Sequence, residues 1–192
     1  MSTGEIARGT EGALRFLKRD PSAPFFFENS IDACLRSFRV MALVAPFYAL
    51  YAVIYYTGVQ VEADEWMIAL VWAMRYVVDW LLFPVLFYEI ARRRHWLDRY
   101  PRYIAALNWM GLPTMAVLLI DAGLALVVSP DLQVVIGLAV QGFLFYWFLM
   151  VTRLCLGISW PLASVLLIVD YVPSVFLSLL VDRVLGVASL AG

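Results

Sequence analysis

The sequence holds very few of the residues from which metal centres and catalytic sites are built. Its 192 residues include one histidine, His95, and two cysteines, Cys34 and Cys155. A structural zinc site takes four such ligands, and a haem or di-metal centre would need a second histidine, so we expect no metal and no cofactor. His95 follows three arginines, a poor setting for a general base, and neither a glycine-rich phosphate loop nor a nucleophile elbow occurs. These absences predict that the protein is not an enzyme.

Charged residues are also scarce, at 15% of the chain, whereas 64% of residues are hydrophobic and the mean hydropathy is +0.83. A soluble domain is typically about 45–50% apolar and about 25% charged. The composition therefore argues against a soluble domain and predicts an all-α, polytopic integral membrane helical bundle. We expect its partners to be the lipid bilayer and either another membrane protein or a second copy of the chain, and no nucleic acid.

Five apolar stretches are long enough to span a membrane, since a helix needs about 20 mainly apolar residues to cross about 30 Å of hydrocarbon. They are residues 40–56, 66–88, 103–128, 132–152 and 160–181. The first is short by itself, so we expect its helix to begin near Ser30 or Ile31, where serine is a suitable N-cap. The predicted organisation is an N-terminal segment (1–30), a five-helix transmembrane domain (31–185) and a short tail (186–192).

The arginines predict which way the chain crosses the membrane. The region up to Arg39 carries six basic residues, the loop after the second span five, and the loop after the fourth span one. The loops after the first and third spans carry none, so twelve of the fourteen basic residues fall on one side. Short loops rich in arginine and lysine stay in the cytoplasm. We therefore expect a cytoplasmic N-terminus and an exterior C-terminus, and the arginine and alanine usage indicates a bacterial inner membrane.

The N-terminal segment carries its own signs of membrane contact. Apolar residues between Ala13 and Leu17 alternate with basic ones, and Phe25, Phe26 and Phe27 follow. This pattern predicts a short basic amphipathic helix at the membrane interface, with a loosely ordered basic tail as the alternative. The residues expected to contact lipid headgroups or a partner are Arg15, Lys18, Arg19, Arg92, Arg93 and Arg94.

Ionisable residues within the spans are the main functional clue. Arg75 and Asp79 lie four apart in the second span, so they share a helix face. Such groups are costly in hydrocarbon and usually face the bundle interior, where they find partners. The membrane interior holds one cation and three carboxyl groups, so a carboxyl is protonated, a cation is bound, or water enters. The predicted buried polar cluster, a possible ion or proton site, comprises Arg75, Asp79, Asp121, Gln141, Asp170, Ser174 and Ser178.

The last span carries a polar stripe, since Asp170, Ser174, Ser178 and Asp182 recur every four residues. One interpretation is the wall of an outward-open polar cavity, with Asp121 on a facing helix. The alternative is structural: serines permit close helix packing, and Asp170 pairs with Arg75.

In outline the chain resembles the Yip1-type membrane proteins, which combine a cytoplasmic N-terminal segment, five spans and a very short exterior tail. The resemblance covers about residues 30–185 and rests on architecture alone. It implies a membrane-organising or protein-sorting scaffold. We therefore expect a non-enzymatic scaffold, assembly factor or accessory subunit, with a small proton- or cation-handling transporter or channel as the alternative.

Overall fold

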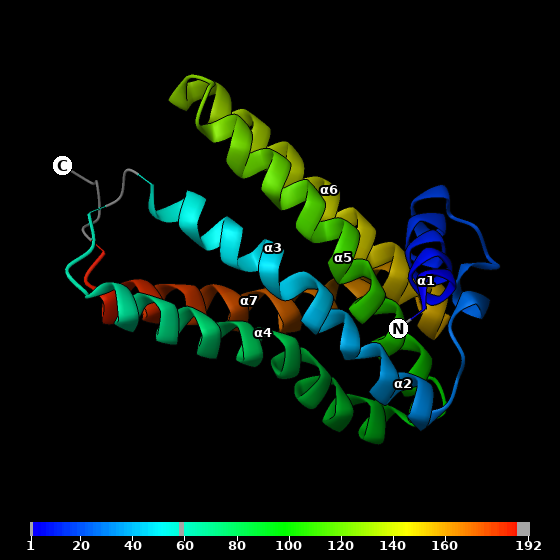
Figure 1. Cartoon of the computed structure of the whole chain (residues 1–192). Helices are drawn as coiled ribbons and strands as arrows, with labels where there is room; N and C mark the ends of the chain where they lie inside the picture. Colours follow the sequence, from blue (N-terminus) through cyan, green and yellow to red (C-terminus); the bar gives the residue numbers. More distant parts are fainter. Residues whose placement is uncertain (1, 58–59, 188–192) are drawn as a thin grey trace.

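The computed structural model describes residues 2–57 and 60–187, and its regular elements in that part of the chain are helices (Figure 1). The N-terminal segment forms an α-helix and two short 3-10 helices: α1 (Thr3–Arg15), η1 (Phe16–Lys18) and η2 (Ala23–Phe26). The remaining helices are α2 (Ile31–Ser37), α3 (Arg39–Tyr56), α4 (Glu65–Arg94), α5 (Tyr100–Ala125), α6 (Pro130–Leu156) and α7 (Trp160–Leu185). With α2 and α3 taken together as Ile31–Tyr56, five helices are long and apolar enough to cross a membrane.

The ends of the spans follow from local sequence. Ser30 caps α2, because its hydroxyl accepts a hydrogen bond from the backbone N–H of Ala33 at 3.2 Å. The predicted start of the first span near Ser30 or Ile31 is therefore confirmed. Gly157 and Gly186 end α6 and α7 with φ of 64° and 63°, a conformation that costs glycine little. The expected spans lie within the observed helices, except that the third runs three residues beyond the end of α5 at Ala125.

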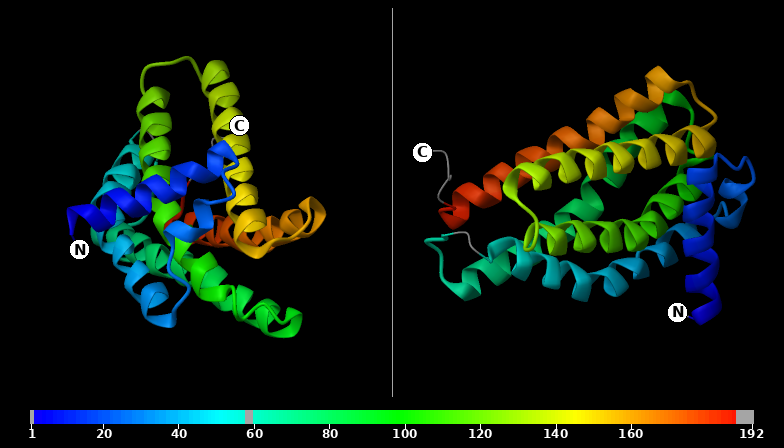
Figure 2. Two further views of the ribbon diagram at one scale, coloured as in Figure 1. Left: turned by 90° about the vertical axis from the view of Figure 1, so that its right-hand side faces the viewer. Right: turned by 90° about the horizontal axis from the view of Figure 1, so that it is seen from above.

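The chain runs up and down, so successive loops lie at alternate ends of the bundle (Figures 1 and 2). One end, here called the arginine-rich end, contains the N-terminal segment, the α4–α5 loop and the α6–α7 loop, where the twelve basic residues identified above lie. The opposite end contains the α3–α4 and α5–α6 turns and Gly186. Which end faces the cytoplasm stays a prediction, as does the exterior position of the tail, of which only Gly186 and Val187 are described.

Packing is densest between α3 and α5 and between α5 and α6, and α1 and α2 also pack on α5. Toward the arginine-rich end the core is aromatic: the ring of Phe87 lies 4.8 Å from that of Tyr103 and 5.7 Å from that of Phe83. The Tyr103 hydroxyl shares a 2.8 Å hydrogen bond with buried Thr152, which satisfies both groups. A smaller cluster around Trp72, Val181 and Leu185 holds α4 and α7 together nearer the opposite end.

Helix α1 lies crosswise over the bundle and packs on α5 and α6 (Figure 2). Its inner face is made of small residues: a Cβ at Gly9 would overlap the indole of Trp109, and one at Gly12 would lie 2.6 Å from Phe26 Cβ. The segment is thus a docked helix instead of a loosely ordered tail, and it begins ten residues before Ala13, where the amphipathic pattern was recognised. Contact of its outer face with lipid stays a prediction.

Candidate polar site within the helix bundle

A cavity of about 340 Å³ lies between α3, α4, α5, α6 and α7, and we call it the central cavity. Its polar lining residues are Tyr48, Tyr76, Asp79, Asn108, Thr114, Asp170 and Ser174, and apolar walls include Phe83, Met115 and Phe148. Asp79 stands fifteenth of the 30 residues of α4, so it lies roughly 20 Å from each end of that helix. The cavity therefore brings two carboxyl groups together deep inside the bundle.

Arg75 lies beside the cavity and is held by three neighbours. Its Nε lies 3.4 Å from Asp79 Oδ2, its Nη2 donates a 2.6 Å hydrogen bond to Ser178 Oγ, and its guanidinium lies 5.2 Å from the centre of the Trp72 ring. The predicted pairing of Arg75 with Asp79 across one helix turn is confirmed. Because Arg75 also joins α4 to α7 through Ser178, it fixes how these two helices pack.

Three polar atoms at the central cavity are buried without a hydrogen-bond partner in the part of the chain that the structure describes: Asp79 Oδ1, Tyr48 OH and Thr114 Oγ1. A buried polar group without a partner costs about 1–3 kcal/mol. Three such groups around one space, with Asp170 beside them, form a lining that suits water, a proton carrier or a small cation. The lining therefore offers carboxyl and hydroxyl groups to a bound molecule or ion.

The structure brings together only part of the predicted cluster. Asp79, Asp170 and Ser174 line the central cavity. Asp121 instead accepts a 3.1 Å hydrogen bond from Gln133 Nε2 near the α5–α6 turn, outside the residues that line the cavity. The expected polar wall running outward from Asp170 is also interrupted, because Ser178 is occupied by Arg75.

Two further expectations were tested by these contacts. The alternative in which Asp170 neutralises Arg75 is wrong, since the ion pair of Arg75 within residues 2–57 and 60–187 is with Asp79. Gln141 is half-buried on α6 and does not line the central cavity. Sequence reasoning missed Tyr48, Asn108 and Thr114, which are uncharged polar residues inside apolar spans and so gave only a weak signal.

The basic residues expected to contact headgroups differ in whether they already pair with other side chains of the protein. Arg15 pairs with Glu11 at 2.7 Å and with Asp20 at 3.0 Å, and Arg19 donates to the Tyr146 hydroxyl at 3.0 Å. Arg92 and Arg93 share Glu89, at 2.9 Å and 3.8 Å. Lys18 and Arg94 form no ion pair with any other described residue.

Asp20 organises the turn that follows α1. Its carboxylate accepts hydrogen bonds from the Ser22 hydroxyl at 2.7 Å and the Ser22 backbone N–H at 2.8 Å. These bonds, followed by the bond from Arg15, hold the pKa of Asp20 below its ordinary value. The segment between α1 and η2 is therefore fixed by a charged carboxylate.

Comparison of the chain with protein-family models, curated proteins and solved structures finds no match.

Proposed function

We propose that this protein is a non-enzymatic integral protein of the bacterial inner membrane that acts as a scaffold, assembly factor or accessory subunit. The observation that carries the proposal is the fixed N-terminal segment. The indole of Trp109 packs against Gly9, and Trp147 Nε1 donates to the Ala13 carbonyl at 2.9 Å, so α1 is seated on the bundle. Short loops join the other helices, which makes the arginine-rich end a preformed surface. A rigid charged surface suits holding a partner.

In this proposal the arginine-rich end faces the cytoplasm, as the positive-inside rule favours, and Lys18 and Arg94 are free to contact anionic headgroups or an acidic partner. A relationship to the Yip1-type proteins would agree with such a role, and it rests only on the five-span architecture.

A second function is favoured by the three unpartnered atoms at the central cavity. A proton or small cation bound between Asp79 and Asp170 would satisfy Asp79 Oδ1 and neutralise the surplus carboxyl. The protein would then handle protons or cations as a small transporter or channel. We rank this function second, because the hydrogen bond from Arg75 to Ser178 interrupts the polar stripe of α7 beside the cavity.

Reconstitution in liposomes separates the two functions. Proton, sodium and potassium flux would be measured for the full chain and for Asp170→Asn. The matched control is Asp131→Asn, in the first turn of α6. The scaffold proposal expects background flux from all three proteins. Flux above background in the wild type and the control, lost in Asp170→Asn, would reject it and establish the second function.

A further inference from the structure

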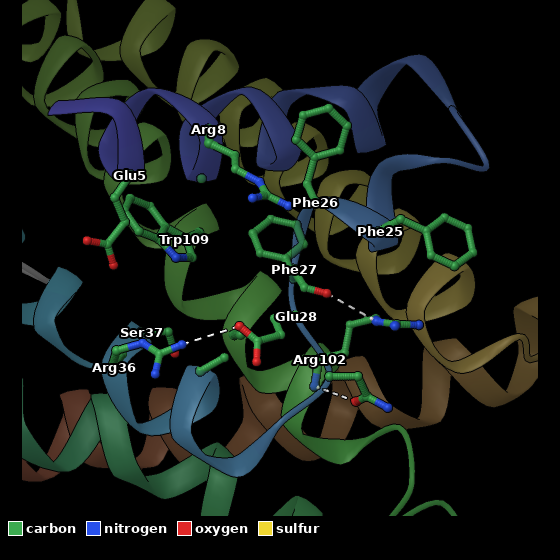
Figure 3. Close-up of a pocket in the computed structure, with 14 residues that line it drawn as sticks. Glu5, Arg8, Phe25, Phe26, Phe27, Glu28, Arg36, Ser37, Arg102 and Trp109 are labelled. Carbon is green, nitrogen blue, oxygen red and sulfur yellow. Dashed lines mark hydrogen bonds and ion pairs between the residues drawn. The ribbon is translucent and has the colours of Figure 1, made fainter. Parts of the chain in front are cut away.

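A second cavity lies under α1 at the arginine-rich end, separate from the central cavity. Its volume is about 460 Å³, and α1, η2, α2 and α5 enclose it (Figure 3). We call it the α1 pocket. Nothing in the proposed scaffold or transport functions uses it.

Three arginines from three helices line the α1 pocket: Arg8 of α1, Arg36 of α2 and Arg102 of α5. Figure 3 shows the side chain of Arg8 descending from α1 into the space above the other two. Two carboxylates, Glu5 and Glu28, also line the pocket, so its charged lining carries one net positive charge.

The arginines keep most of their hydrogen-bond donors available. Arg8 forms no ion pair with another described residue. Arg102 uses Nε to donate to the Phe27 carbonyl at 3.2 Å, which leaves both Nη groups. Arg36 makes one 3.3 Å contact with Glu28. Guanidinium groups with free Nη donors are the side chains best suited to binding phosphate oxygens.

The pocket is also held in shape by contacts that do not involve a ligand. The backbone N–H of Arg102 donates to Asn29 Oδ1 at 3.2 Å, and Asn29 Nδ2 donates to the Asp98 carbonyl at 2.7 Å. Trp109, packed against Gly9, forms its apolar wall. The three arginines therefore project from a framework that is already fixed, which lowers the entropy lost on binding.

We propose that the α1 pocket binds a phosphate group, and that in the membrane this group is the phosphodiester of an anionic phospholipid. Two observations favour a lipid over a soluble phosphate. The pocket lies at the end of membrane-spanning helices, and the apolar side chain of Phe25, which lines it, is 68% exposed. The Arg102 guanidinium stacks 5.3 Å from the centre of that ring, so charged and apolar surfaces meet as they do at a lipid headgroup.

Native mass spectrometry of the full chain in detergent, titrated with phosphatidylglycerol or with phosphatidylcholine, tests the proposal. The wild type is expected to prefer phosphatidylglycerol, and Arg8→Gln to weaken that binding about tenfold, because one charge-assisted contact is lost. Arg39→Gln is the matched control, since it removes the same charge from an exposed residue at the same end but outside the pocket, and its affinity should stay within about twofold of the wild type.

Glu5→Gln gives a test that loss of folding cannot imitate. It removes a pocket carboxylate that forms no described ion pair, so binding of phosphatidylglycerol should tighten severalfold. Equal effects of Arg8→Gln and Arg39→Gln, or no preference for phosphatidylglycerol in the wild type, would overturn the lipid proposal. A rise in melting temperature with inorganic phosphate, seen in the wild type and lost in Arg8→Gln, would instead assign the pocket to a soluble phosphate.

Discussion

The indole Nε1 of Trp147 donates a 2.9 Å hydrogen bond to the carbonyl oxygen of Ala13, across 134 positions of sequence. Both residues are buried, so the bond ties the last turn of α1 to the C-terminal half of α6. It also satisfies a carbonyl near the helix C-terminus, where intrahelical partners run out.

Replacing Trp147 with phenylalanine should loosen α1. The change leaves the Ala13 carbonyl buried and unpaired, which costs about 1–3 kcal/mol. Amide hydrogen exchange over residues 3–15 should therefore rise by about one order of magnitude or more. The control is Trp66→Phe, because Trp66 is 63% exposed and lies at the opposite end. Unchanged exchange in α1 after Trp147→Phe would show that the bond does not hold the helix.

Two glycines of α1 give a matched pair. Gly9→Ala places a Cβ in the Trp109 ring, so α1 must move away and lose about 1–3 kcal/mol of packing. Gly4→Ala adds a Cβ with nothing within 4 Å, so it should stabilise α1 by up to about 1 kcal/mol through helix propensity. Thermal unfolding in detergent and exchange of residues 3–15 measure both. Equal effects of the two substitutions would contradict the docking of α1.

Arg75→Gln should destabilise the bundle by about 3 kcal/mol. Asp79 would lose its cation, although protonation of the carboxyl would avoid part of the cost of a buried charge. The double variant Arg75→Gln/Asp79→Asn should recover part of the loss, because no lone charge remains. Chemical unfolding in detergent gives the three free energies, and an additive double variant would show that the pair is not coupled.

The hydrogen bonds of Asp20 lead us to expect that the stability of α1 depends on pH. Because its pKa is lowered in the folded protein, its contribution is present above its unfolded pKa, near 3.8, and is lost as pH falls below that value. The protection factors of residues 3–15, which are corrected for the intrinsic pH dependence of exchange, should therefore fall below about pH 4 in the wild type. Asp20→Asn should show lower protection already at neutral pH and little further change in protection on acidification. A wild-type profile that is flat down to pH 2 would contradict this role.

The membrane orientation can be tested with single cysteines. Cys34 and Cys155 are buried and free, so background labelling should be low. In intact cells, an impermeant maleimide should label Asp64→Cys and leave His95→Cys unlabelled, because these residues lie at opposite ends of the bundle. The reverse pattern would invert the proposed orientation, and labelling of both would overturn the five-span crossing.

Much of the fold follows from one-dimensional features of the sequence. Apolar length defines the five spans, and helix geometry alone pairs Arg75 with Asp79, since both are on one helix. Partners on different helices were harder to predict. Whether Asp170 faces Arg75 or a cavity depends on how α4 and α7 rotate against each other, and that depends on side-chain packing around Trp72 and Val181.

The docking of α1 onto the bundle could not be predicted from the sequence for a similar reason. Basic and apolar residues around Arg15 drew attention to the lipid interface, whereas Gly9 and Gly12 carry no charge or hydrophobicity to signal a contact. Their role in packing can be recognised only once Trp109 is known to lie against Gly9, and Phe26 against Gly12. Small residues on one face of an amphipathic helix were the available sign.

The contact between Ala13 and Trp147 has a consequence for biosynthesis. Helix α1 leaves the ribosome long before the part of α6 that receives it, so it cannot reach its final position until three spans have been inserted and the fourth has followed. Until then the carbonyl of Ala13 lacks the hydrogen bond from Trp147. Complete docking of α1 is therefore a late step in assembly. In a chain whose synthesis stops before Trp147, α1 would not reach its final position on the bundle.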